Sequence, residues 1–306
     1  MKKLSVIFFG THHFAATILA GLLESPLISV ALVITRPDQP AGRGRQTKKP
    51  AVKILAEKYQ LKIDQPPTLK SYQLPATSYQ LGIVAQYGLL IPGRIINAPE
   101  YGTLNVHTSL LPKYRGASPG QCALINGESE TGVTIMKMDE GLDTGPILSQ
   151  AKLKIAPDDT YPDLEEKLAR LGLSALLKTV PPYCRGELGG LAQTENEATY
   201  CCMLTRADGR IDWSKNTEEI YNLYRGLTPW PGIWTMWGNA RLKLVKIKPH
   251  DKTIAAGKVL IANKQLLIGT KNKSIEILEL QLEGKKSMDA QTFINGHKQI
   301  NGVILK

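Results

Sequence analysis

Two polar side chains end an apolar stretch near residue 105. Asn105 and His107 lie two residues apart, so on a strand they point to the same face. An amide and an imidazole can both donate hydrogen bonds to an oxygen that gains negative charge during a reaction. Taken alone, either residue could instead be a buried structural side chain. The same region contains Ser109-Leu110-Leu111-Pro112, Arg115-Gly116 and Gly141-Leu142-Asp143-Thr144-Gly145.

Other residue types give no indication of a metal, a disulfide or a nicotinamide cofactor. The cysteines, Cys122, Cys184, Cys201 and Cys202, include no C-x-x-C pair, which disfavours a zinc site or a disulfide framework. The turn at residues 10–15 lacks the G-x-G-x-x-G spacing that lets the backbone approach a pyrophosphate. We therefore expect no metal in the site.

The first two thirds of the chain alternate strand and helix patterns, which predicts a parallel sheet. Such a sheet binds ligands beyond the carboxyl ends of its strands, and Asn105 and His107 would lie there. The expected strands are residues 4–9, 28–35, 81–85, 103–107 and 133–138, and the expected helices are residues 14–23, 51–59 and 163–179.

A different pattern begins near residue 185. Residues 185–206 are rich in Gly, Glu, Thr and Asn without a period, as in a surface linker. A short helix near 217–225 is followed by alternating segments at 240–248, 257–261, 265–269 and 274–280, which predict a small β-barrel or sandwich. The sequence thus predicts an α/β chain with a Rossmann-like parallel-sheet domain at 1–184, a linker at 185–206 and an OB-like β-barrel domain at 207–306.

The formal net charge of +11 favours a polyanionic partner, although a basic surface can also serve solubility alone. Residues 205–306 contain 17 Lys and Arg against 9 Asp and Glu, so most of the excess positive charge lies in the C-terminal part. No apolar run reaches the roughly 20 residues of a membrane span, and no signal-peptide core begins the chain. We expect a cytoplasmic protein.

The motifs resemble a known family. Asn105-x-His107, the Ser109 to Pro112 run and Asp143 are similar to the signature of enzymes that use 10-formyltetrahydrofolate. Residues 36–45, 211–214 with 229–232, and 280–286 resemble the methionyl-tRNA formyltransferases within that group. The chain departs from the family pattern at His12-His13, at Gln86 and at Ala117-Ser118-Pro119-Gly120.

The resemblance implies transfer of a formyl group from 10-formyltetrahydrofolate, as co-substrate, to the methionyl amine of an initiator tRNA. When the amine attacks the formyl carbon, the oxygen becomes negative and requires hydrogen-bond donors. The resemblance makes Asn105, His107 and Asp143 the catalytic residues. Asn105 and His107 would donate to that oxygen, while Asp143 would stabilise the charged ring of His107 and orient it for proton movement.

The resemblance also implies binding residues. The folate pocket would use Ser109, Leu110, Leu111 and Pro112, with backbone groups at Gln86, Tyr87, Gly88, Leu89 and Gly141. Residues 36–53 contain six basic residues and one acidic residue, and this loop resembles the one that meets the tRNA acceptor stem. Its expected tRNA-binding residues are Arg36, Arg43, Arg45, Lys48 and Lys49, with Arg43 entering the stem. A solvated loop without a ligand is the alternative.

Several rival functions remain. A sugar-nucleotide formyltransferase, a purine-pathway formyltransferase and a formyltetrahydrofolate hydrolase share the signature, but the basic loop and the basic C-terminal part disfavour them. A tRNA-binding module without catalysis is the rival from another class. The intact Asn105, His107 and Asp143 disfavour that module. We expect a monomer.

Overall fold

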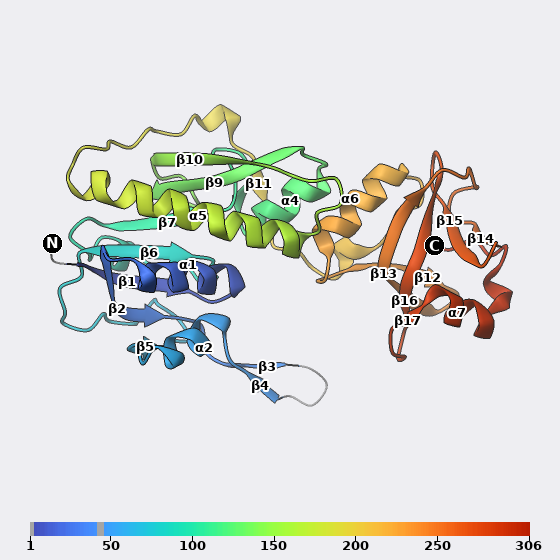
Figure 1. Cartoon of the computed structure of the whole chain (residues 1–306), viewed down its shortest axis with the longest axis horizontal. Coiled ribbons are helices and arrows are strands. Elements are labelled where there is room, and N and C mark those ends of the chain that lie inside the picture. Colours follow the sequence, from blue (N-terminus) through green and yellow to red (C-terminus); the bar gives the residue numbers. More distant parts are fainter. Residues whose placement is uncertain (1–2, 42–45) are drawn as a thin grey trace. The chain divides into compact units, whose positions relative to one another are not determined.

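A computed structural model describes residues 3–41 and 46–306 (Figure 1). The contacts within the chain divide it into two compact units. Unit 1 consists of Met1–Pro119, Glu130–Lys154 and Glu165–Cys201, and unit 2 consists of Gly120–Ser129, Ile155–Leu164 and Cys202–Lys306. Two segments that precede the predicted linker therefore belong to unit 2.

Unit 1 is built on one seven-stranded sheet. Its strands lie in the order β10 (Ile147–Lys154), β9 (Glu130–Lys137), β7 (Thr103–His107), β6 (Leu81–Ala85), β1 (Leu4–Gly10), β2 (Ile28–Ile34) and β5 (Ile63–Asp64). The five strands from β7 to β5 run parallel, and the sequence predicted four of them but not β5. The predicted strand at 133–138, which is β9, was expected in the parallel sheet but runs antiparallel to β7. β9 and β10 are antiparallel additions, because the chain returns from the carboxyl end of β7 without crossing the sheet.

Helices cover one face of this sheet. α1 (His13–Glu24) and α5 (Tyr161–Cys184) pack so closely that a Cβ added to Gly21 would lie 2.0 Å from Leu173 Cδ2. A Cβ added to Gly172 of α5 would lie 2.8 Å from Val106 Cγ1 of β7. The two helices lie along the strands in Figure 1. The shorter elements of unit 1 are α2 (Ala51–Lys58), α3 (Gly93–Ile96), β3 (Gln39–Ala41) and β4 (Gln46–Lys48).

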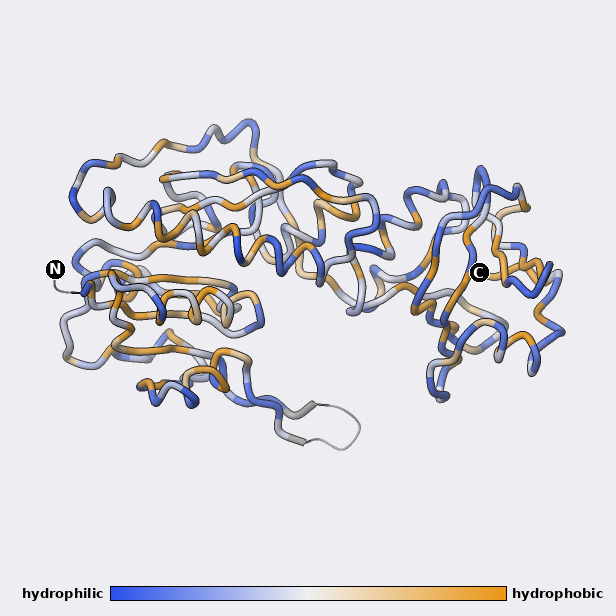
Figure 2. The backbone as a smooth tube through the Cα atoms, in the orientation of Figure 1, coloured by the Kyte–Doolittle hydropathy of each residue, from blue (hydrophilic) through white to orange (hydrophobic). Residues whose placement is uncertain are grey.

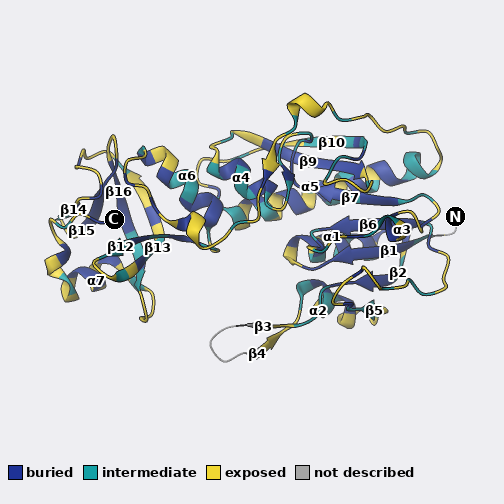
Figure 3. Ribbon diagram, turned by 180° about the vertical axis from the view of Figure 1, so that it is seen from behind, coloured by how far each residue is buried: buried dark blue, intermediate teal, exposed yellow. Residues whose placement is uncertain are grey.

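The opposite face of the sheet is buried by a segment without a long helix. Phe9 and Ile34 of the sheet share a core cluster with Leu69, Tyr79 and Ile95. Figure 2 shows the apolar residues concentrated in the strands, and Figure 3 shows β1 and β6 as buried. Burial on both faces explains why these strands are continuous apolar runs in the sequence.

Unit 2 contains an antiparallel sheet that closes on itself. Its order is β12 (Ile233–Trp237), β13 (Ala240–His250), β16 (Ser274–Leu282), β15 (Gln265–Gly269) and β14 (Val259–Ala262), and β17 (Met288–Asp289) pairs with β16. The C-terminal residues join the outer strands, because Val259 N donates to Val303 O and Met236 N donates to Lys306 O, each at 2.8 Å. This closure agrees with the predicted β-barrel.

Helices flank the sheet of unit 2. α6 (Thr217–Leu227) begins at Asn216, whose N–H donates to Glu219 Oε2 at 2.9 Å. α7 (Ala290–Gly296) begins at Asp289, whose side chain accepts a hydrogen bond from Thr292 N. The sequence patterns did not predict α7, β12 or α4 (Pro119–Ile125). Each is short, so it offers little periodicity to read.

The segment predicted as a linker contains regular contacts. β11 (Tyr200–Cys201) pairs in parallel with β8 (Arg115–Gly116). Leu191 and Ile147 exchange two backbone hydrogen bonds of 2.8 Å. The described residues also form short 3₁₀ helices at η1 (Glu195–Glu197), η2 (Ala207–Gly209) and η3 (Lys298–Ile300). Residues 191–201 lack a period because their partners are distant segments rather than their own neighbours.

Candidate active site

The structure brings together the three side chains that the sequence predicted as catalytic. Asn105 Nδ2 donates to Asp143 Oδ1 at 3.4 Å, and His107 Nδ1 lies 3.7 Å from the same oxygen. Gly116 N donates to the other carboxylate oxygen of Asp143 at 2.8 Å. Asn105 and His107 lie on the face of the sheet opposite α5, because Val106 between them packs on α5. Their catalytic roles stay a prediction.

His107 is held by a hydrogen bond at one ring nitrogen and faces Asp143 with the other. Its side chain is 6 % exposed, and Nε2 lies 2.9 Å from the carbonyl oxygen of Tyr114. Because a carbonyl oxygen can only accept a hydrogen bond, Nε2 carries a hydrogen and donates it. Nδ1 is therefore the nitrogen that faces Asp143 and that is placed to exchange a proton.

Asp143 lies in a tight turn with an unusual backbone. Its φ of 54° is in the left-handed region, which few residues other than Gly adopt. Within the turn, Gly141 N and Thr144 Oγ1 both donate to Asp139 Oδ1, at 3.0 and 2.8 Å. Gly141 is exposed, and its side-chain-free backbone is part of the predicted folate pocket. The turn presents the Asp143 carboxylate to β7.

The Ser109 to Pro112 run is only partly open to a ligand. Ser109 has no exposed surface and Leu111 is 3 % exposed. Ser109 O accepts from Thr134 Oγ1 at 2.7 Å, and Leu111 N donates to the same hydroxyl at 3.1 Å. Leu110 and Pro112 retain partial exposure. Ser109 and Leu111 thus anchor the run on β9, whereas Leu110 and Pro112 are half-buried and accessible to a ligand.

The turn after β6 also mixes buried and exposed residues. Gln86 and Gly88 have positive φ values of 43° and 82°. Tyr87 between them is 2 % exposed, and burial raises the pKa of Tyr87 to about 12. Leu89 is half-buried, whereas Leu90 is 85 % exposed. A ligand at this turn would meet the backbone and Leu90 rather than the Tyr87 side chain.

The basic loop adjoins this turn through Arg36. A Cβ added to Gly88 would lie 3.7 Å from both Cδ and Nη1 of Arg36. Lys48 and Lys49 are exposed, and Lys49 Nζ forms an ion pair of 2.8 Å with Glu57. Arg43 and Arg45 lie outside the described residues. Arg36 therefore connects the predicted tRNA-binding loop with the predicted folate-binding turn.

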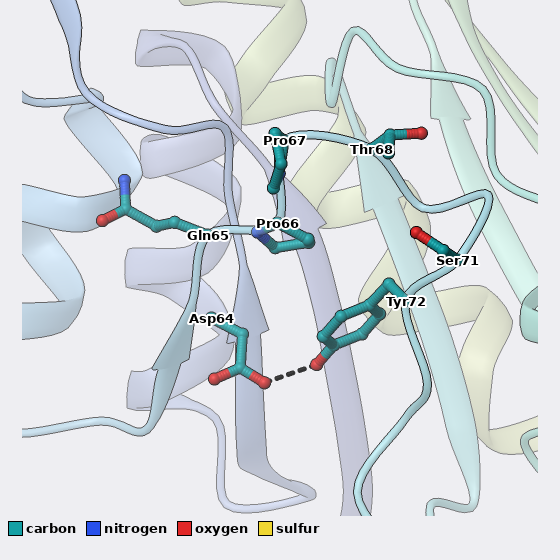
Figure 4. A pocket seen from close by; sticks show the side chains of 7 residues that line it. All are labelled: Asp64, Gln65, Pro66, Pro67, Thr68, Ser71 and Tyr72. Carbon is teal, nitrogen blue, oxygen red and sulfur yellow. Dashed lines mark hydrogen bonds between the residues drawn. The ribbon is translucent and has the colours of Figure 1, made fainter.

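A cleft of about 450 Å³ lies beside the end of β5, and no predicted site residue lines it. Figure 4 shows that the Tyr72 hydroxyl donates to Asp64, while Gln65 points away from both. Gln65 Nε2 donates instead to Arg36 O at 2.7 Å and to Asp38 Oδ1 at 2.9 Å. The lining residues are Asp64, Gln65, Pro66, Pro67, Thr68, Ser71 and Tyr72. The cleft lies next to the base of the loop, apart from the candidate active site.

Sequence reasoning missed residues that support the Asp143 turn. Gln193 Nε2 donates to Asp143 O and to Gly145 O, each at 2.8 Å. Buried Arg115 contacts Gln193, and the sequence placed Arg115 in the signature without a role. Nothing in the local pattern distinguishes Gln193 from the other polar residues of the predicted linker.

No group of three or more His, Cys, Asp or Glu side chains among the described residues could hold a metal ion. No described helix is long and apolar enough to cross a membrane. Among the described residues, Cys122, Cys184, Cys201 and Cys202 form no disulfide bond.

The sequence matches known protein families along nearly its whole length. Residues 2–180 match the formyl transferase family, and residues 203–298 match the formyl transferase C-terminal domain. The methionyl-tRNA formyltransferase of Desulfotalea psychrophila is 41 % identical, with 100 % of this chain and 96 % of the relative covered. The methionyl-tRNA formyltransferase of Thermodesulfovibrio yellowstonii is 40 % identical, with 97 % of each covered.

Solved structures share the fold at lower sequence identity. A sugar 3N-formyl transferase crystallised with dTDP and 5-N-formyl-THF has a TM-score of 0.67 and 21 % identity, covering 94 % of this chain and 100 % of its own. HypX from Aquifex aeolicus in complex with tetrahydrofolic acid has a TM-score of 0.68 and 15 % identity, covering 99 % of this chain and 49 % of its own. At these identities the likeness establishes the fold alone.

Proposed function

The chain belongs to the formyl transferase family, and from that premise we propose that it transfers the formyl group of 10-formyltetrahydrofolate to the α-amino group of methionyl initiator tRNA. The product is N-formylmethionyl-tRNA, which serves translation initiation. The observation that carries the proposal is similarity along the whole chain to methionyl-tRNA formyltransferases, at 41 % identity in one relative. The proximity of Asn105, His107 and Asp143 supports it.

The three side chains supply the groups that this reaction needs. The amine nitrogen forms a bond to the formyl carbon, the bond from that carbon to folate N10 breaks, and one proton moves from the amine to N10. Asn105 uses one amide hydrogen in a long 3.4 Å bond to Asp143, so the other can stabilise the oxygen of the tetrahedral intermediate. His107 exchanges the proton at Nδ1, since Nε2 is held by Tyr114.

The residues beside these side chains fit a flat reduced pterin. Gln86 and Gly88 have positive φ values in the turn after β6, and backbone groups of this turn are proposed to bond the edge of the ring. Exposed Leu90 and half-buried Leu110 supply apolar surface. The proposed pocket comprises Gln86, Tyr87, Gly88, Leu89, Ser109, Leu110, Leu111, Pro112 and Gly141, in which the buried members act as supports.

Two basic regions suit the tRNA partner. The loop at residues 36–53 is proposed to meet the acceptor stem through Arg36, Arg43, Arg45, Lys48 and Lys49. In unit 2, Trp234 is flanked by Arg241, whose Cζ is 4.3 Å from the ring centroid, and by Arg210 at 5.9 Å. Guanidinium groups held on a ring are preorganised to meet phosphates.

We assign these roles to the predicted division of the chain. Residues 1–184 form the catalytic domain, residues 185–206 the linker and residues 207–306 the tRNA-contacting domain. Acting on a charged tRNA places the enzyme in the cytoplasm. One chain carries all the proposed catalytic residues, so a monomer is sufficient for the reaction.

The direct test supplies the purified full chain with 10-formyltetrahydrofolate and methionyl-tRNA, with initiator and elongator tRNA in separate reactions. Formylmethionine is measured over time after the ester bond is cleaved. Formylation of the initiator in strong preference to the elongator is the expected result. Release of tetrahydrofolate without formylmethionine would identify a hydrolase instead. Tight binding of tRNA with no turnover would identify a module without catalysis.

A further inference from the structure

One segment of unit 1, residues 191–201, is attached at its start to β10 and at its end to β8. We call it the clamp segment. At its start, Leu191 and Ile147 exchange two backbone hydrogen bonds of 2.8 Å. At its end, β11 pairs with β8, and Arg115 N donates to Thr199 O at 2.8 Å. These attachments fix the position of the residues between them.

Between these attachments, Gln193 holds the backbone of the Asp143 turn. Its amide nitrogen donates to Asp143 O and to Gly145 O, each at 2.8 Å. These bonds use both amide hydrogens. One of the two acceptors is the carbonyl of Asp143, the residue whose φ of 54° is unfavourable for a side chain, so the amide stabilises a turn that the local chain would otherwise leave.

Arg115 in turn fixes Gln193. Arg115 Nε donates to Gln193 Oε1 at 3.1 Å, and this orients the amide with its hydrogens toward the turn. The guanidinium is fully buried, and its Nη1 donates to Glu195 Oε2 at 2.9 Å and to Tyr200 Oη at 3.1 Å. A buried charge with several partners holds its geometry closely, because each alternative orientation leaves donors unpaired.

The clamp segment also reaches the other side of the site. Gly116 of β8 donates its N–H to Asp143 Oδ2 at 2.8 Å. A Cβ added to Gly116 would lie 2.5 Å from Cys201 O of β11, which shows how closely the two strands approach. Thr199 Oγ1 accepts from Tyr114 N at 2.8 Å, and the carbonyl of Tyr114 holds the His107 ring. Both Asp143 and His107 thus depend on contacts with this segment.

We propose that Gln193 is a positioning residue for the reaction, anchored by Arg115, which holds the Asp143 turn so that the carboxylate meets His107 and Asn105. Gln193 itself touches no reacting atom. The expected effect of Gln193 on kcat rests on the proposed function. Its structural consequence, a more rigid turn at residues 141–145, does not depend on that function.

The kinetic test compares Gln193→Leu and Gln193→Met with the wild type. Both variants keep the size of the side chain and remove its hydrogen bonds. We expect kcat to fall about tenfold or more, with the KM values for tRNA and for 10-formyltetrahydrofolate within about twofold. Gln121→Leu is the matched control, because Gln121 Nε2 donates to Gly226 O at 3.0 Å and to Trp230 O at 3.3 Å in unit 2. This control should keep the wild-type kcat.

A double-mutant cycle separates positioning of Asp143 from a general structural effect. In an Asp143→Asn background, removing the Gln193 amide should cost little further activity in single-turnover assays, because the group that it positions is already disabled. Full additivity of the two losses would overturn the proposal. An unchanged kcat in both single variants, with an active wild type, would overturn it as well.

Amide hydrogen exchange tests the clamp without catalysis. In Gln193→Leu and Gln193→Met, the amides of residues 141–145 should exchange faster than in the wild type, with little change in the amides of unit 2. An inactive wild type would refute the proposed function but leave this measurement valid. Exchange at residues 141–145 that equals the wild type in both folded variants would refute the clamp.

Discussion

The substitution Asn105→Ala tests the proposed chemistry most directly. If the second amide hydrogen stabilises the intermediate, its loss should lower kcat by roughly a hundredfold to a thousandfold, which corresponds to about 3 kcal/mol of transition-state stabilisation. The substitution should lower the free energy of unfolding by much less than it lowers transition-state stabilisation. The Asn105 bond to Asp143 is long, at 3.4 Å, and Asp143 keeps its 2.8 Å bond from Gly116 N. The free energy of unfolding should therefore fall by no more than about 1 kcal/mol.

The assay measures kcat for formylation of initiator methionyl-tRNA at saturating concentrations of both substrates, together with urea unfolding of each variant. Asn301→Ala is the matched control, because Asn301 Oδ1 accepts from Ile261 N at 2.8 Å in unit 2. It should lose a similar amount of stability and keep the wild-type kcat.

Two results would refute this reasoning. A kcat within about threefold of the wild type in a folded Asn105→Ala variant would show that the amide does not stabilise the intermediate. A loss of stability large enough to unfold the protein under the assay conditions would show that Asn105 is a structural residue, the alternative that the sequence left open.

Three further predictions address binding and stability. Arg43→Ala should raise the KM for tRNA while leaving that for 10-formyltetrahydrofolate unchanged in steady-state kinetics; an equal rise in both would contradict a role at the acceptor stem. Tyr87 Oη is a buried atom without a hydrogen-bond partner among the described residues, so Tyr87→Phe should raise the free energy of unfolding by about 1 kcal/mol at pH 7. Burial raises the folded-state pKa of Tyr87 from 10.0 to about 12, so the stability that the neutral phenol contributes is present below pH 10 and is lost as the pH rises toward 12. Urea unfolding across this pH range should show a smaller alkaline loss of unfolding free energy for the Phe variant than for the wild type. Equal losses in the two proteins would contradict this expectation. Gly21→Ala should destabilise by about 1 to 3 kcal/mol, since the new Cβ would lie 2.0 Å from Leu173 Cδ2, whereas Gly296→Ala, with no atom within 4 Å, should unfold at or above the wild-type temperature.

The sequence by itself determined the elements that carry the site. The predicted strands at 81–85 and 103–107 are β6 and β7 with the same bounds, because continuous apolar runs closed by polar residues are a local signal. The period of a strand also places Asn105 and His107 on one face. The excess positive charge beyond residue 205 and the family signature are likewise properties of the sequence alone.

Only the tertiary structure decided which of these residues meet. Asp143 follows β9, which pairs with β7, and only the fold of the turn after β9 brings its carboxylate beside His107. Packing also decided that the side chains of Ser109, Leu111 and Tyr87 are buried. Gln193 is bound to the Asp143 turn although it lies in a segment with no period. Local patterns encode which side of an element is apolar, whereas proximity between distant segments depends on packing summed over the whole unit, so no single motif contains it.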